Sequence, residues 1–129
     1  MSETVSTVLL LFGLFQIKHM LADYFLQTPK MLSGRGEYWH MGRAQHAGVH
    51  ALGSILVFLV VGAPLPFVLA VAAGEWVVHF NIDYGKARYS EAKCLDPSQA
   101  GFWRAAGLDQ ALHQLTYVAM AWAWVEYAA

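Results

Sequence analysis

The chain has 129 residues, a length that fits one domain. It is 57% hydrophobic and only 13% charged, whereas ordinary soluble domains have about 25% charged residues, so the composition indicates a membrane protein. The formal net charge of −1 shows no basic footprint of the kind that nucleic acid partners require, and the single cysteine excludes an internal disulfide.

Residues 5–27 form the first apolar segment, which is long enough for a bilayer crossing of about 20 residues. Pro29 ends it, because proline disfavours helix in the residue before it. The N-terminus lacks the basic stretch of a cleaved signal peptide, so we expect this segment to be a retained span. Residues 29–43 follow as a polar loop, in which we expect His40 to be an interfacial residue rather than a ligand.

The second and third apolar segments, residues 44–62 and 67–88, are separated by a turn that contains Pro64 and Pro66. Proline suits the first turn of a helix. So short a connection predicts two antiparallel neighbouring helices.

The longer loop, residues 89–106, contains a stretch from 97 to 106 that could form a short helix lying in the membrane interface. The last apolar segment, residues 107–127, ends in aromatic residues, which settle at membrane interfaces. The sequence therefore predicts an all-α, polytopic membrane protein. Its single domain, residues 1–129, would hold four transmembrane helices arranged as two duplicated helical hairpins.

Seven of the eight Lys and Arg residues fall on or beside the two long loops, while the short turn and both termini carry none. Basic residues accumulate on the cytoplasmic side of a membrane protein. Both long loops are therefore expected in the cytoplasm and both termini on the opposite side.

Each of the four predicted helices carries a pair of His or Asp residues four positions apart, a spacing that places both side chains on one helix face. Random placement of His and Asp would give about 0.75 such pairs, so four pairs are not an accident. The pairs are His19 with Asp23, His46 with His50, His79 with Asp83, and Asp109 with His113.

The four pairs also agree in depth. In the first and third helices the pair lies just before the cytoplasmic exit, and in the second and fourth it lies just after the entry. The order of a His-x-x-x-Asp-Tyr helix, a basic loop and a [His/Asp]-x-x-x-His helix occurs twice. We infer a duplication, which would bring the pairs to face one another around a pseudo-two-fold axis normal to the membrane.

Ionisable groups at such depth cost about 2.5–3.5 kcal/mol each, so they are kept only when paired and usually mark function. Three aspartates among neutral imidazoles carry three negative charges, which one or two divalent cations would neutralise. Mixed imidazole and carboxylate ligands suit Zn²⁺, Mn²⁺ or Fe²⁺. The predicted metal ligands are His19, Asp23, His46, His50, His79, Asp83, Asp109 and His113. Asp23 and Asp83 are the candidate catalytic residues, one of them free to act as a general base.

The motif set resembles a bacterial family of unknown function, numbered thirty-three-oh-seven. The resemblance rests on Lys18-His19-x-x-x-Asp23-Tyr24, His46-x-x-x-His50, His79-Phe-x-x-Asp83 and Asp109-Gln110-x-x-His113, and it covers nearly the whole chain. Members of this family are small multi-pass inner-membrane proteins, and similar His-x-x-x-Asp frames occur in proteins labelled membrane-bound metal-dependent hydrolases. The resemblance implies a metal-binding protein of the bacterial inner (cytoplasmic) membrane.

The leading hypothesis is an integral membrane metal-dependent hydrolase that acts on a lipid or lipid-linked substrate at the cytoplasmic face. Three alternatives stay open. Two histidines from facing helices could hold a b-type haem, or the polar cluster could pass protons or metal ions, which would require a homo-oligomer because four spans leave little room for alternating access. The cluster could also be a structural scaffold that only holds the helices together.

Two sets of polar side chains outside the pairs have a structural and a functional interpretation. Lys18 and Glu75 are expected to form a structural ion pair, with a proton relay as the alternative. Lys86, Arg88 and Arg104 are expected to set the orientation and to contact lipid headgroups. Their alternative role is to hold an anionic substrate.

Overall fold

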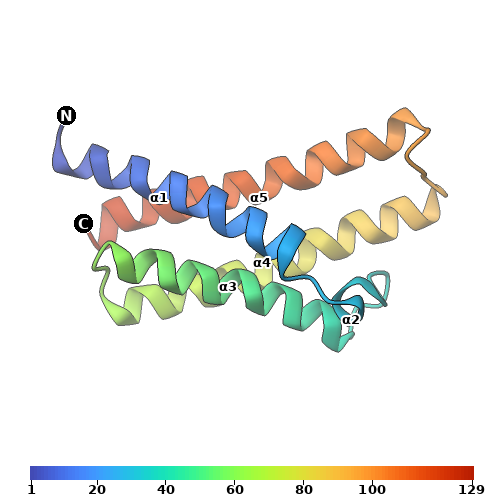
Figure 1. The fold of residues 1–129 in the computed structure, drawn as a ribbon, viewed down its shortest axis with the longest axis horizontal. Helices are drawn as coiled ribbons and strands as arrows, with labels where there is room; N and C mark the ends of the chain where they lie inside the picture. Colours follow the sequence, from blue (N-terminus) through green and yellow to red (C-terminus); the bar gives the residue numbers. More distant parts are fainter.

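The structure, a computed structural model, describes residues 1–129 and is entirely helical. Its elements are α1 (Glu3–Met20), the π-helix η1 (Leu21–Phe25), α2 (Pro29–Leu32), α3 (Met41–Val60), α4 (Leu65–Ala92) and α5 (Ala100–Tyr127). The four long helices form a bundle (Figure 1). Both termini lie at the same end as the α3–α4 turn, and α2 and the two longer connections lie at the other, here called the loop end. The all-α prediction is confirmed.

Local signals set two of the helix starts. The Thr28 hydroxyl accepts a hydrogen bond from the Met31 N–H, and Pro29 occupies the first position of α2. At the start of α3, His40 Nδ1 accepts a hydrogen bond from the Gly42 N–H at 3.1 Å. His40 is thus a helix cap outside the four pairs.

The first helical segment, Glu3–Phe25, covers nearly all of the span that the sequence predicts at residues 5–27, but its last turn is not α-helical. At Met20 it passes into the π-helical turn η1, in which the Leu26 N–H donates to the Leu21 carbonyl five residues back, at 2.9 Å. Asp23 lies within this turn. Such π-turns are rare and concentrate at functional sites.

The first hairpin consists of α1, η1 and α3, and the second of α4 and α5. The second hairpin is longer than expected, because α4 continues to Ala92 and α5 already begins at Ala100. The expectation of a separate interfacial helix at residues 97–106 is wrong, since the residues from Ala100 onward form the first turns of α5. No proline follows Pro97 in the sequence, so nothing interrupts the helix up to Tyr127. At the loop end, α4 and α5 extend beyond α2 and diverge (Figure 1).

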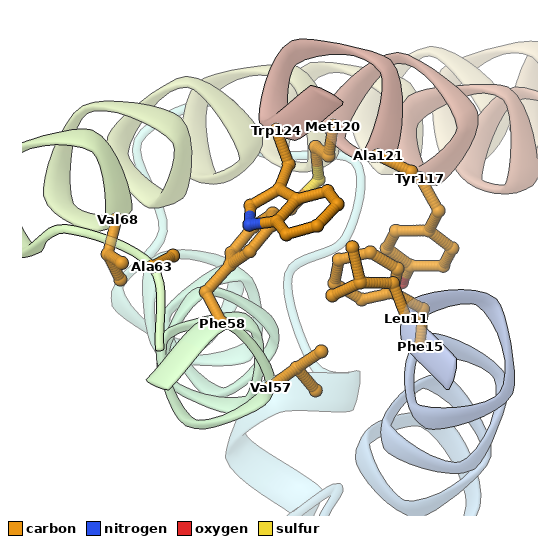
Figure 2. Packing of buried hydrophobic residues seen from close by; sticks show 10 residues of the cluster. All are labelled: Leu11, Phe15, Val57, Phe58, Ala63, Val68, Tyr117, Met120, Ala121 and Trp124. Atoms are coloured by element: carbon orange, nitrogen blue, oxygen red, sulfur yellow. The ribbon is translucent and has the colours of Figure 1, made fainter. Parts of the chain in front are cut away.

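The two helices of each hairpin are in contact, α1 with α3 and α4 with α5. Between the hairpins, α3 lies against α4 as its antiparallel neighbour and α1 contacts α5. The apolar core fills the half of the bundle near the termini, where the Phe15 ring stacks on Tyr117 with centroids 5.1 Å apart (Figure 2). Its members are Leu11, Phe15, Val57, Phe58, Ala63, Val68, Tyr117, Met120, Ala121 and Trp124. The half near the loop end holds the polar pairs instead.

Two helices, Glu3–Phe25 and Leu65–Ala92, are long and apolar enough to cross a membrane, with mean hydropathies of 1.6 and 1.5. α3 and α5 do not meet this criterion. All four long helices nevertheless expose large apolar side chains, among them Leu9, Leu56 and Leu69, while 10 of the 26 buried residues are polar or charged. Length and composition thus point to a membrane location.

Candidate metal centre

The four His/Asp pairs meet inside the loop-end half of the bundle. A continuous series of side-chain contacts, each shorter than 4 Å, joins all eight residues. The five imidazoles are at most 7% exposed. Every one of them presents Nε2 to a carboxylate in these contacts.

Asp23 is the centre of the first set of contacts. Its Oδ2 lies 3.0 Å from His19 Nε2, one helical turn back along the same chain segment. Its Oδ1 lies 2.9 Å from His50 Nε2 and 3.3 Å from His46 Nε2, both on α3. The carboxylate therefore joins the two helices of the first hairpin.

Asp83 is the centre of an equivalent set in the second hairpin. Its Oδ2 lies 3.1 Å from His79 Nε2 on its own helix, and its Oδ1 lies 3.1 Å from His113 Nε2 on α5. His46 Nε2 also approaches it, at 3.6 Å from Oδ2. Two of the three partners correspond between the sets, His19 to His79 and His50 to His113, as a duplication of the hairpin would give.

Three groups of side chains bring their ligand atoms within 4.8 Å of one another, the separation expected around one metal ion. They are His19 with Asp23 and His50, His79 with Asp83 and His113, and His46 with His50 and His79. The first two groups are the repeat-related triads. The third connects them, because the His50 and His79 rings are stacked with centroids 3.9 Å apart.

Asp109 lies beside these groups rather than in one. Its Oδ1 is 3.6 Å from His113 Nε2, and its Oδ2 is 3.9 Å from Lys86 Nζ. Its counterpart in the first hairpin, His46, reaches both central carboxylates. The structure thus places seven of the eight predicted ligands in groups that could hold a metal and the eighth at their edge.

Tyr117 and Gln110 support the first triad from α5. The Tyr117 hydroxyl oxygen is 2.8 Å from His19 Nδ1, and Gln110 Oε1 is 2.9 Å from His19 Nε2. A partner on the second nitrogen fixes the orientation of a metal-binding imidazole. Tyr117 is such a partner of His19, whereas Gln110 contacts Nε2, the nitrogen that also faces Asp23. The sequence analysis missed Tyr117; its signal is the spacing of four residues after His113, which puts both on one helix face.

The expected ion pair between Lys18 and Glu75 is present behind the cluster, with Nζ 2.5 Å from Oε1 and both side chains buried. Lys18 Nζ also lies 3.1 Å from the Tyr117 hydroxyl and 3.5 Å from His50 Nδ1. Gly53 makes room for this lysine, since a Cβ there would lie 2.5 Å from Lys18 Cγ. Because Lys18 is paired with Glu75, it does not balance the aspartates of the cluster.

Three buried polar atoms of the cluster have no hydrogen-bond partner: His46 Nδ1, His79 Nε2 and Asp109 Oδ1. His79 Nε2 is close to the Asp83 carboxylate but not at a hydrogen-bonding angle. Buried polar atoms are nearly always satisfied in proteins, and a cation bound at His79 Nε2 would satisfy it. With imidazole and carboxylate donors, these residues fit a divalent transition metal.

A cavity of about 460 Å³ leads from the loop end to the cluster. Asp23, His46 and Asp83 line it, and the side chains of Asp23 and Asp83 are 16% and 31% exposed. Arg35 and Lys86 also line this cavity. A solute or headgroup with negative charge could therefore reach the two central carboxylates only past basic side chains.

Arg43 lines the same cavity and is buried, with 5% exposure, although it lies at the end of the predicted polar loop. Its guanidinium donates to the backbone carbonyls of Glu37, Tyr38 and Phe80 and lies over the Phe80 ring, 3.9 Å from the centroid. Arg43 therefore fixes the first loop against α4.

The family model described as Protein of unknown function (DUF3307) matches residues 10–129. No curated protein and no solved structure matches the chain. The matched range contains all four His/Asp pairs, which carried the resemblance noted in the sequence.

Proposed function

The chain belongs to this family over nearly its whole length, and we propose that it is a membrane-bound metal-dependent hydrolase with two metal positions. The observation that carries the proposal is the convergence of two repeat-related triads, each with two imidazoles and one carboxylate. A scaffold that only holds helices together does not need the same three donors twice, nor buried donor atoms without partners.

Each triad would hold one metal ion. His19, Asp23 and His50 would hold the first, and His79, Asp83 and His113 the second, with His46 between them. In both triads the carboxylate contacts the Nε2 atoms of its two imidazoles. Three protein ligands with further positions open is the arrangement of catalytic zinc sites, and Mn²⁺ or Fe²⁺ suits the same donors. When bound, such ions polarise an ester or phosphoester and lower the pKa of water to near neutrality.

The chain's own residues would position substrate and water. Asp23 and Asp83 face the cavity at the loop end, so either could accept a proton from a water molecule there. The stacked Phe15 and Tyr117 rings close the opposite side with the apolar core. Substrate would therefore enter from the loop end only.

The proposed location is the bacterial inner membrane, with α1, α3, α4 and α5 as four spans and both termini outside the cytoplasm. Support comes from the two apolar helices, from the apolar side chains that all four helices expose, and from the basic residues at the loop end. The cytoplasmic loop end would place the cavity at the level of lipid headgroups. A lipid or lipid-linked substrate follows from that position.

A second candidate function is the translocation of protons or metal ions. One observation favours it: the contacts from His50 through Lys18 to Glu75 extend the polar network toward the terminal half of the bundle, where Glu75 Oε2 has no partner. The haem alternative finds no such support. The stacked imidazoles His50 and His79, 3.9 Å apart, leave no room for a porphyrin between them.

Elemental analysis of the detergent-purified protein tests the proposal. We expect about two equivalents of Zn, Mn or Fe per chain, and metal-dependent hydrolysis of a phosphoester or ester in a panel of lipid-like substrates. Flux of metal or protons into proteoliposomes without hydrolysis would favour the second candidate. A folded protein without stoichiometric transition metal would refute the metal centre.

A further inference from the structure

A second cavity, of about 820 Å³, lies between α4 and α5 near the loop end, where the two helices diverge (Figure 1). Its walls are mostly apolar, with Val77, Val78 and Ile82 from α4 and Leu108 and Leu112 from α5. We call this cavity the α4–α5 groove. Its size is within the range of ligand-binding pockets, about 300–1,000 Å³.

The polar lining of the groove includes two basic residues, Lys86 and Arg104, and one acidic residue, Asp109. Arg104 lines it, is exposed, and makes no hydrogen bond or ion pair within the chain. Lys86 lines it as well, with one third of its side chain exposed and Nζ 3.9 Å from Asp109 Oδ2. Asp109 partly balances Lys86, so Arg104 is left as an unbalanced positive charge beside apolar walls.

The groove adjoins the cavity of the metal centre. Lys86 and Asp109 line both cavities. A ligand could therefore place an apolar chain in the groove and a charged group at Lys86, within reach of the metal-centre cavity.

We propose that the α4–α5 groove binds one acyl chain of a lipid whose phosphate headgroup is held by Lys86 and Arg104. The apolar walls suit an apolar chain, and the exposed guanidinium, which has no partner within the chain, suits an anion, which a phosphate monoester or diester supplies. A second copy of this chain fits less well, because a symmetric contact here would bring each protomer's Arg104 toward its own copy. The presentation of the lipid ester to the metal centre rests on the proposed function; binding in the groove does not.

Photo-crosslinking tests the groove. The full chain is placed in nanodiscs of phosphatidylcholine that contain a small fraction of phosphatidic acid with a diazirine in its acyl chain, and labelled peptides are mapped by mass spectrometry. We expect labels within residues 77–89 and 101–112. The same diazirine on phosphatidylcholine should label these segments less.

Two substitutions with matched controls distinguish lipid bound in the α4–α5 groove from lipid that only contacts the outer surface of the helices. Gly85 lines the groove and has open space around an added Cβ, so Gly85→Leu should fill the groove and abolish the labels. Gly74 on the same helix also has open space but lies outside the groove, so Gly74→Leu should leave them unchanged. Arg104→Gln should lower labelling by phosphatidic acid about fivefold, the effect of one basic residue on anionic lipid, and Lys93→Gln, outside the groove, should not.

Equal labelling by both probes, or labels spread over the outer faces of all four helices, would overturn the proposal. Absence of groove labels together with recovery of the chain as a dimer would overturn it as well. Metal content is measured on the same samples. Labels in the groove without bound metal would support the lipid site while refuting the hydrolase, and bound metal without these labels would do the opposite.

Discussion

Asp23→Asn tests the two-metal proposal most directly, because it removes one carboxylate while preserving the shape of the side chain. The change leaves the first triad with the imidazoles of His19 and His50, which lie 3.0 and 2.9 Å from the carboxylate. Two protein ligands are fewer than the three typical of a catalytic zinc site. We expect the variant to bind one metal ion per chain instead of two.

The net charge of the cluster also predicts one bound metal ion in Asp23→Asn. With two divalent cations, the three aspartates of the cluster leave a net charge of +1, and in Asp23→Asn two cations would leave +2 in a buried site. One cation leaves the variant neutral, which a low-dielectric interior favours. Loss of a residue that only supports a ligand weakens metal affinity about 10–100-fold, so loss of the ligand itself should weaken the first site by at least about 100-fold.

The assay is elemental analysis of protein dialysed against a weak chelator, with helix content from circular dichroism as the control for folding. Asp83→Asn is the matched variant, since Asp83 has the same place in the second hairpin, and it should also retain one ion. The double variant should retain none. Two ions in either single variant would refute the assignment of one carboxylate to each metal position.

Three further substitutions test the surroundings of the centre. Lys18→Met should lower the free energy of unfolding by about 3–5 kcal/mol, because it leaves the buried Glu75 carboxylate unpaired; thermal unfolding in detergent measures this, and adding Glu75→Leu should restore most of the loss. Tyr117→Phe should weaken metal affinity about 10–100-fold in a chelator competition, since the lost hydroxyl lies 2.8 Å from a ligand imidazole. Phe58→Ala, at a fully buried position, should cost about 3–5 kcal/mol, whereas Ala at the exposed Trp122 should cost about 0.5 kcal/mol or less. Each expectation would be contradicted by one result: an unchanged free energy of unfolding in Lys18→Met, or an unchanged metal affinity in Tyr117→Phe. For the last pair, the contradicting result is an equal loss of stability on alanine substitution at Phe58 and at Trp122.

The pairs within each helix could be predicted because helical spacing is a local property. His79 and Asp83 are four residues apart, so their side chains share a face wherever the helix packs, and their closest atoms are 3.1 Å apart. Contacts between helices depend on where the axes cross, which spacing does not specify. The sequence therefore could not show that His46 reaches both central carboxylates, whereas Asp109 contacts His113 and Lys86.

Two features of the fold were missed for a related reason. The π-turn around Asp23 depends on one shifted backbone hydrogen bond, and the residues of this turn give no propensity signal for it. The burial of Arg43 was not predicted either: three backbone carbonyls and the Phe80 ring surround it because the first loop folds back on α4. Its burial is a property of the tertiary structure. The four spans and the orientation of the termini stay predictions.

The two hairpins differ at one position of the cluster, and this difference connects the metal centre to the groove. His46 closes the centre on the side of the first hairpin, because its Nε2 lies within 3.6 Å of both central carboxylates. The equivalent Asp109 is itself a carboxylate, so it cannot donate a hydrogen bond to the central carboxylates, and it contacts His113 and Lys86 instead. If the position of Asp109 held a neutral imidazole, as the equivalent position does in the first hairpin, no negative charge would offset Lys86. The Asp109 carboxylate does offset it and can hold Lys86 where both cavities meet. In our proposal, the duplication supplies two equivalent metal positions, and the change from His to Asp in one copy supplies the side on which an anionic lipid can enter.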